Sequence, residues 1–175
     1  MPAVECAAWF EAAGPERGWV LPVLAAAVLG FAGKSSAPAA APEAIAFATY
    51  GKPYFVRNDF QPGVPRSYLV IRSWSGFQAV FGVGATMGGP KATIGPELFR
   101  SKMLLVAIER GPLCTFVAAK VDRLARGIAF EYGLRCPAPS SASFAVPLIV
   151  AIERSDAPVS FVENGRTIEV VRVTR

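Results

Sequence analysis

Hydrophobic and polar residues alternate over much of the second half of the chain, a period of two that is typical of β-strands with one buried face. The clearest case is residues 128–136, in which Ile128, Phe130 and Tyr132 share one face with Leu134 and Cys136. Residues 102–109 (KMLLVAIE) are almost continuously apolar, which predicts a strand covered on both faces. Residues 114–123 predict a third strand between these two, with turns at residues 110–112 and at Gly127.

Shorter patterns predict the remaining elements. Strands are expected at residues 44–49, 54–57, 68–71, 144–153, 159–163 and 166–173. Ser73 predicts the N-cap of a helix that extends through Phe81. Pro147 indicates an edge or bulge position in its strand, and Asn164-Gly165 predicts a type I′ hairpin turn. The fold class expected is α+β, mainly antiparallel β: a small β-sheet or sandwich with one short helix.

Cys114 and Cys136 are equally distant in sequence from Ala125. A turn centred on Ala125 would place them opposite each other on neighbouring strands, within reach of a disulfide. A two-residue turn would shift the register by one and place them on opposite faces. The pattern leaves both registers open, and a β-bulge near Ala118-Ala119 would reconcile them. The alternative is a pair of unbonded buried cysteines.

The N-terminal quarter of the chain lacks this alternation. Residues 19–32 (WVLPVLAAAVLGFA) carry no charge and resemble the apolar region of a signal peptide, followed by a possible A-x-A cleavage site at residues 37–39. Glu5, Glu11 and Glu16 depart from the positive start of a signal peptide, which suggests that translation begins nearer Trp19. An uncleaved anchor and an ordinary buried helix are the alternatives.

These segments define the expected organisation: residues 1–33 a signal-like or anchor segment, 34–43 an Ala/Pro/Ser linker, and 44–175 a β-rich domain. Cleavage would remove Cys6 and leave two cysteines, as a single disulfide in an exported chain requires. A periplasmic or secreted location is therefore expected. Membrane contact would be transient through residues 19–32, or permanent if they remain as an anchor.

The chain contains no histidine, which excludes Ser-His-Asp and Cys-His catalysis and removes the commonest zinc ligand. We therefore expect no enzyme activity, no cofactor and no metal. The net charge of +5 comes from dispersed basic residues, so nucleic-acid binding is not expected. Candidate contacts for a protein partner are Arg110, Gly111, Pro112 and Leu113 in a turn, and the basic residues Lys120, Arg123 and Arg126.

The order of elements over residues 68–161 resembles that of the PrcB-like C-terminal domain. Three segments carry the resemblance: YLVIRSWSGFQAVFG, ELFRSKMLLVAIERG and FAVPLIVAIERSDAPVSF. This family is named after an exported subunit of a bacterial protease complex. Its usual Gly-Gly-Tyr-like motif after the turn is replaced here by Gly111-Pro112-Leu113. The resemblance implies a small, exported, non-catalytic domain that associates with another envelope or secreted protein.

Two other functions fit the residues. A carrier of a small apolar ligand would need an enclosed pocket lined by Phe130, Tyr132 and their neighbours. A Ser/Lys hydrolase needs no histidine, and the chain has five lysines, but no motif places one beside a serine.

Overall fold

A computed structural model describes residues 41–51, 53–84, 94–136 and 142–173, which all belong to one compact unit, Pro38–Arg175. The signal-like segment 1–33 and most of the expected linker lie outside the described residues. The elements in chain order are β1 (Glu43–Ala44), β2 (Ala48–Tyr50), β3 (Tyr54–Val56), β4 (Arg66–Ile71), α1 (Trp74–Val80), β5 (Phe81–Val83), the 3-10 helix η1 (Pro96–Arg100), β6 (Lys102–Gly111), β7 (Thr115–Leu124), β8 (Gly127–Arg135), β9 (Phe144–Glu153), β10 (Val159–Glu163) and β11 (Arg166–Val171).

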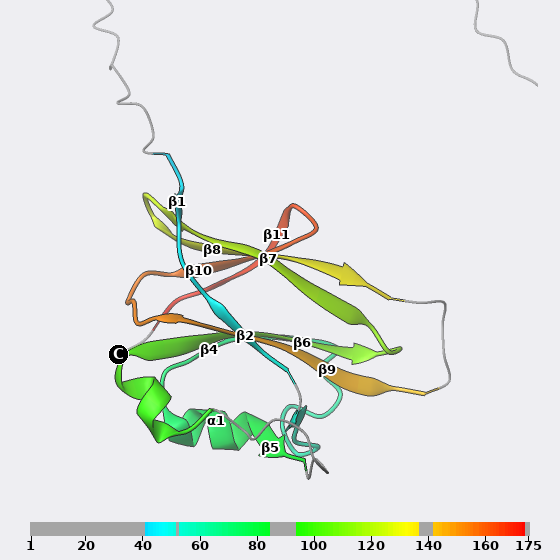
Figure 1. Ribbon diagram of the computed structural model, residues 1–175. Helices are drawn as coiled ribbons and strands as arrows, with labels where there is room; N and C mark the ends of the chain where they lie inside the picture. Colours follow the sequence, from blue (N-terminus) through cyan, green and yellow to red (C-terminus); the bar gives the residue numbers. More distant parts are fainter. Residues whose placement is uncertain (1–40, 52, 85–93, 137–141, 174–175) are drawn as a thin grey trace, which may run out of the picture. The chain divides into compact units, whose positions relative to one another are not determined.

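These elements form three layers (Figure 1). A four-stranded antiparallel sheet in the order β2-β9-β6-β4 lies in the middle. A five-stranded sheet in the order β1-β7-β8-β10-β11 covers one face of it, and α1, η1 and the small β3-β5 sheet cover the other. The predicted α+β class, a sandwich dominated by antiparallel strands with one short α-helix, is confirmed for the described part of the chain.

Strand β6 is at the centre of the core because its side chains are apolar on both faces. Met103, Leu105 and Ala107 pack toward the five-stranded sheet, against residues such as Phe130. The alternate residues Leu104, Val106 and Ile108 pack toward the helical layer. All six are at most 1% exposed, which confirms the strand predicted to be covered on both faces.

The β6 strand is longer than the sequence predicts. A break was expected at residues 110–112, but Arg110 and Gly111 continue the ladder opposite Ala145 and Phe144 of β9. The prediction was wrong here because pairing with β9 holds the backbone extended, which the local Gly-Pro signal cannot reveal.

Helix α1 begins as predicted. The Ser73 hydroxyl accepts a hydrogen bond from the Gly76 backbone N–H at 3.1 Å, and Phe77 and Val80 are buried against the middle sheet. The helix ends at Val80, one residue earlier than expected, because Phe81 begins β5 and pairs with Val56.

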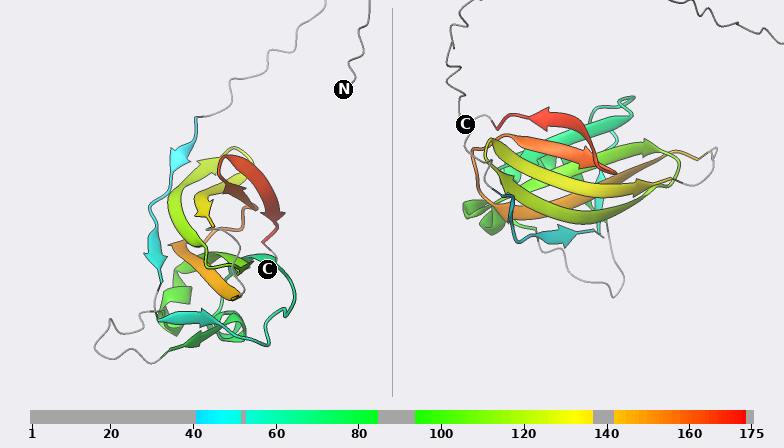
Figure 2. Two further views of the ribbon diagram at one scale, coloured as in Figure 1. Left: turned by 90° about the vertical axis from the view of Figure 1, so that its right-hand side faces the viewer. Right: turned by 90° about the horizontal axis from the view of Figure 1, so that it is seen from above.

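Residues 44–49 do not form the single strand that the sequence predicts. Glu43 and Ala44 pair with β7 in the five-stranded sheet, whereas β2 pairs with β9 in the middle sheet. The segment therefore crosses the side of the sandwich from one sheet to the other, as the cyan ribbon shows in Figures 1 and 2. We call residues 43–50 the strap. The first described strand thus begins at Glu43, within the expected linker.

The β7–β8 hairpin contains both of the registers that the sequence left open. Next to the turn, Leu124 pairs with Gly127 across a two-residue turn. A bulge between Ala118 and Lys120 then shifts the register, so that Thr115 pairs with Arg135. The shift places Cys114 opposite Cys136, and the two form a disulfide with Cα atoms 4.2 Å apart. The bulge and the disulfide are therefore confirmed.

The C-terminal hairpin confirms the predicted type I′ turn. Asn164 and Gly165 both have positive φ, 48° and 83°, which this turn requires at its two central positions. Strand β10 also pairs in parallel with β8, a contact that the sequence does not predict. Pro147 lies in an interior strand, but the ladder between β9 and β2 covers only residues 149–151, so the proline lies outside it.

Candidate interaction surface

The turn residues proposed for partner contact have different roles. The Arg110 guanidinium donates to the Phe60 and Val64 carbonyl oxygens at 2.9 and 3.0 Å and to the Ser67 hydroxyl at 3.0 Å. Burial lowers the pKa of Arg110. Its side chain therefore holds the loop before β4 in place, whereas Leu113 is 56% exposed and accessible.

The three basic candidates lie along β7 and at its far end. The Lys120 ammonium forms ion pairs with Asp122 at 3.1 Å and Glu131 at 3.4 Å, and the hydrogen bonds that it donates to these carboxylates raise its pKa. Arg123 lies 3.7 Å from the Glu43 carboxylate of the strap. Arg126 is exposed in the two-residue turn.

The structure therefore does not bring the predicted contacts together. Gly111, Pro112 and Leu113 precede β7, and Arg126 follows it, so a strand of 10 residues separates the two groups. At about 3.3 Å per residue this is roughly 33 Å. A single small contact cannot include both ends of the hairpin.

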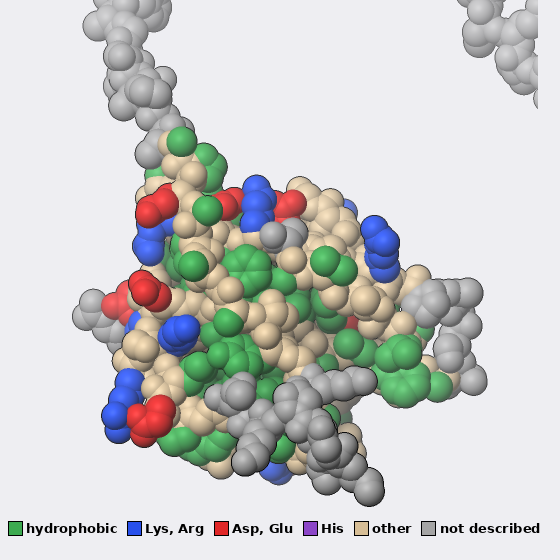
Figure 3. Space-filling model, viewed as in Figure 1, with side chains coloured by type: hydrophobic (Ala, Val, Ile, Leu, Met, Phe, Trp, Pro, Cys, Tyr) green, Lys and Arg blue, Asp and Glu red, His purple; other side chains and the backbone are tan. Residues whose placement is uncertain are grey.

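Exposed apolar side chains gather at the β6–β7 end of the molecule. Leu113 is 56% exposed, and Phe144, which lies opposite Gly111 in the β6–β9 ladder, is 45% exposed. Figure 3 shows hydrophobic side chains grouped at this end, at the right of the view. Val117, 56% exposed on the outer face of β7, extends the apolar character along the strand. We call Leu113, Val117 and Phe144 the apolar end.

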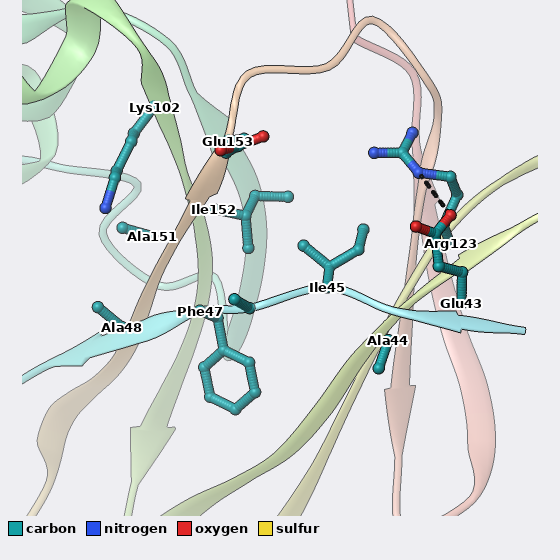
Figure 4. Close-up of a pocket in the computed structure, with 11 residues that line it drawn as sticks. Glu43, Ala44, Ile45, Phe47, Ala48, Lys102, Arg123, Ala151, Ile152 and Glu153 are labelled. Carbon is teal, nitrogen blue, oxygen red and sulfur yellow. Dashed lines mark ion pairs between the residues drawn. The ribbon is translucent and has the colours of Figure 1, made fainter.

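The opposite end holds a pocket of about 400 Å³ between the strap and the ends of β6, β7 and β9. Lys102, Arg123, Glu43 and Glu153 supply its charges, and Ile45 forms part of its apolar wall (Figure 4). Among the described residues, no serine lines this pocket beside Lys102. Of the other lysines that a Ser/Lys hydrolase could use, Lys120 pairs with two carboxylates, and the remaining three lie outside the described residues.

Phe130 and Tyr132, the expected lining of a ligand cavity, are at most 1% exposed and pack in the core. Tyr132 contacts Phe116 and Phe130 contacts Phe161, both edge-on, and the rings of Phe130 and Tyr132 are tilted against each other. A carrier would need an open cavity between the two sheets. Within the described part of the chain, these side chains fill that space.

A polar cluster that the sequence analysis did not identify closes one end of the space between the sheets. Arg66 lies 2.7 Å from Glu109 and 3.3 Å from Glu163, and both carboxylate side chains are less than 15% exposed. Burial raises the pKa of Glu109, an effect that Arg66 opposes and Glu163 reinforces. No local signal could have identified the cluster, because its members come from β4, β6 and β10.

Two tyrosine hydroxyls adjoin this cluster. The Tyr68 and Tyr132 oxygens are buried and have no hydrogen-bond partner among the described residues. Burial raises the pKa of Tyr132, and the neighbouring Tyr68 and Glu163 add to this shift. Arg66 contacts both carboxylates of the cluster, so we interpret this cluster as the polar closure of the core.

Among the described residues, no group of three or more Cys, Asp or Glu side chains is arranged to hold a metal ion. None of the helices described is long and apolar enough to span a membrane. Comparison with protein-family models, with curated proteins and with solved structures finds no match to this chain.

Proposed function

We propose that this chain is an exported, non-catalytic domain that binds another envelope or secreted protein. The observation that carries the proposal is the disulfide between Cys114 and Cys136, the two cysteines of the described domain. Stable disulfides are typical of proteins outside the reducing cytoplasm. The signal-like residues 19–32 support the same compartment.

Binding is favoured because apolar side chains are exposed at the β6–β7 end of the domain. Leu113, Val117 and Phe144 are each at least 45% exposed, whereas the polar Arg110 and Lys120 make contacts within the domain. Exposed apolar groups that lie together are typical of interaction sites. The resemblance of residues 68–161 to the PrcB-like domain would place the partner in an exported protease complex.

The compartment is tested by trapping thiols in intact cells that produce the full chain. We expect the protein outside the cytoplasm, with Cys114 and Cys136 unreactive toward a maleimide until a reductant is added. The double variant Cys114→Ser/Cys136→Ser gives the baseline, which includes any label on Cys6 where the N-terminal segment is retained. Recovery of the protein from the cytosol with both thiols reactive would contradict the proposal.

The binding role is tested by recovering the tagged protein and its stoichiometric partner from an envelope fraction. Leu113→Asp places a charge in the apolar end and should reduce recovery by about tenfold or more, equivalent to roughly 1.4 kcal/mol. Leu124→Asp is the matched control, because Leu124 is 42% exposed and lies at the other end of β7, next to the turn. Equal recovery with both variants would exclude the apolar end as the contact.

A further inference from the structure

The outer edge of β7 is covered only at one end. The strap pairs with β7 at Asp122 and Arg123, and the Ile45 N–H donates to the Val121 carbonyl oxygen at 2.7 Å. No described strand pairs with the outer side of residues 115–118. Among the described residues, the same edge that binds an extended segment of this chain at one end is therefore unpaired at the other.

The hydrogen bonds of β8 show which backbone N–H and C=O groups of β7 point toward the outer edge. Tyr132 and Leu134 of β8 bond to Asn164 on the β10 side, with the Asn164 N–H donating to the Tyr132 oxygen at 2.9 Å. Gly133 and Arg135 therefore face β7 and bond with Val117 and Thr115. It follows that the N–H and C=O groups of Phe116 and Ala118 point outward, away from β8.

Other edges of the sandwich are protected. Beyond Ala118, the bulge disrupts β7, and Lys120 places a charge there, both of which discourage pairing. The uncovered part of β9 contains Pro147, which has no N–H to donate. At the opposite side of the sandwich, the edge strands β4 and β11 lie against each other.

The side chains of the vacant edge also suit an added strand. Leu113, Thr115 and Val117 are exposed at alternate positions, whereas Cys114 is buried and Phe116 is half-buried. A neighbouring strand would place its own side chains beside Val117 on one face and beside Phe116 on the other. The disulfide at Cys114 anchors the start of the edge to β8.

We propose that residues 115–118 of β7 are a strand-addition site for an extended segment of a partner protein. The segment pairs with the outward groups of Phe116 and Ala118, and it carries a β-branched or aromatic residue beside Val117. This inference rests on the proposed binding function and specifies how the partner is held. The strap, which pairs with the same edge further along, provides the intramolecular precedent.

The test uses the full chain in its own cell, with the photoreactive residue p-benzoylphenylalanine at position 117 and, in a second strain, at position 170 of β11. Val170 is 50% exposed and serves as the control site. Ala118→Pro removes one outward N–H without removing a bond to β8, and Ala118→Val keeps that N–H with similar bulk. The melting temperature of each variant is measured in parallel.

We expect an adduct with one protein from position 117 and none from position 170. Ala118→Pro should reduce its yield by about tenfold, the effect of roughly one lost hydrogen bond, and Ala118→Val should not reduce it. If Ala118→Pro does not fold, amide exchange in the purified native adduct gives the answer: the Phe116 and Ala118 amides should be protected relative to the free chain.

Three results would overturn the inference. An adduct that is insensitive to Ala118→Pro, or that leaves both amides unprotected, would mean that a partner binds here by side chains alone, and the proposed function would remain. An adduct of twice the mass of this chain would assign the edge to a second copy. No adduct at position 117, together with no partner in the recovery experiment, would overturn both the inference and the proposed function.

Discussion

Neighbouring residues of β6 show how strand alternation separates two roles. Glu109 lies on the face of β6 that carries Met103 and Leu105, between the two sheets, and reaches Arg66 and Glu163. Arg110 lies on the other face and bonds with Phe60, Val64 and Ser67. Arg110 was expected to contact a partner, but its hydrogen bonds are within the domain.

The stability of the domain should depend on pH through Glu109. Its pKa is raised in the folded protein, so folding favours the protonated carboxyl, and this contribution is present at low pH and lost as the pH rises through the folded pKa. Glu109→Gln mimics the protonated form. The unfolding free energy of the variant relative to that of the native chain should therefore be higher at pH 7 than near pH 3.5.

Denaturant unfolding at several pH values measures this difference. Glu169→Gln, on the exposed strand β11, provides the baseline for a surface substitution. A relative stability of Glu109→Gln that falls as the pH rises would show that the ion pair with Arg66 outweighs the effect of burial.

At the scale of elements, the turn, the bulge and the disulfide of the β7–β8 hairpin require one another, because together they fix its register. The two-residue turn alone would place the cysteines on opposite faces, and the bulge at Ala118/Lys120 corrects the register by one residue. The bonded pair then links the start of β7 to the end of β8, 22 residues apart in sequence.

Loss of the disulfide should destabilise the domain measurably. The bond closes a loop of 22 residues, and closing such a loop in the unfolded chain contributes about 3 kcal/mol. Cys114→Ala/Cys136→Ala should lower the unfolding free energy by about this amount. Denaturant titration of the native chain with and without reductant gives the comparison, and an unchanged midpoint in both cases would contradict the expectation.

At the scale of the whole molecule, the strap joins the two sheets along one side. Its two short strands pair with β7 and β9. Ile45 and Tyr50 are half-buried, and its other residues are exposed. The strap covers backbone edges more than it fills the core. Its removal should therefore expose two sheet edges and leave both apolar clusters largely complete.

Truncation tests this role of the strap. A chain that starts at Ala41 should keep the melting temperature of the full chain, because β1 and β2 remain. A chain that starts at Gly51 should melt several degrees lower and self-associate, since the edges of β7 and β9 become free. Calorimetry and size-exclusion chromatography provide the two measurements, and a monomeric, equally stable shorter chain would contradict the assignment.

Much of the fold could be predicted from the sequence because its signals are local. The period of two in β8, the continuous apolar run of β6, the Ser73 cap and the Asn164-Gly165 turn each depend on neighbours in the chain. The same local patterns allowed both registers of the β7–β8 hairpin and suggested the bulge that reconciles them. Of the candidate contacts, Leu113 was expected in a turn, and its side chain is exposed there.

The sequence by itself determined most of the elements, the β-rich class and the cysteine pair available for a disulfide, since backbone preference and side-chain alternation act over a few residues. Only the tertiary structure decided which strands are neighbours. The parallel pairing of β8 with β10, the crossing of the strap and the meeting of Arg66, Glu109 and Glu163 all join residues far apart in sequence. The free edge at Phe116 and Ala118 belongs to the same group, because an edge exists only where the assembled sheet ends.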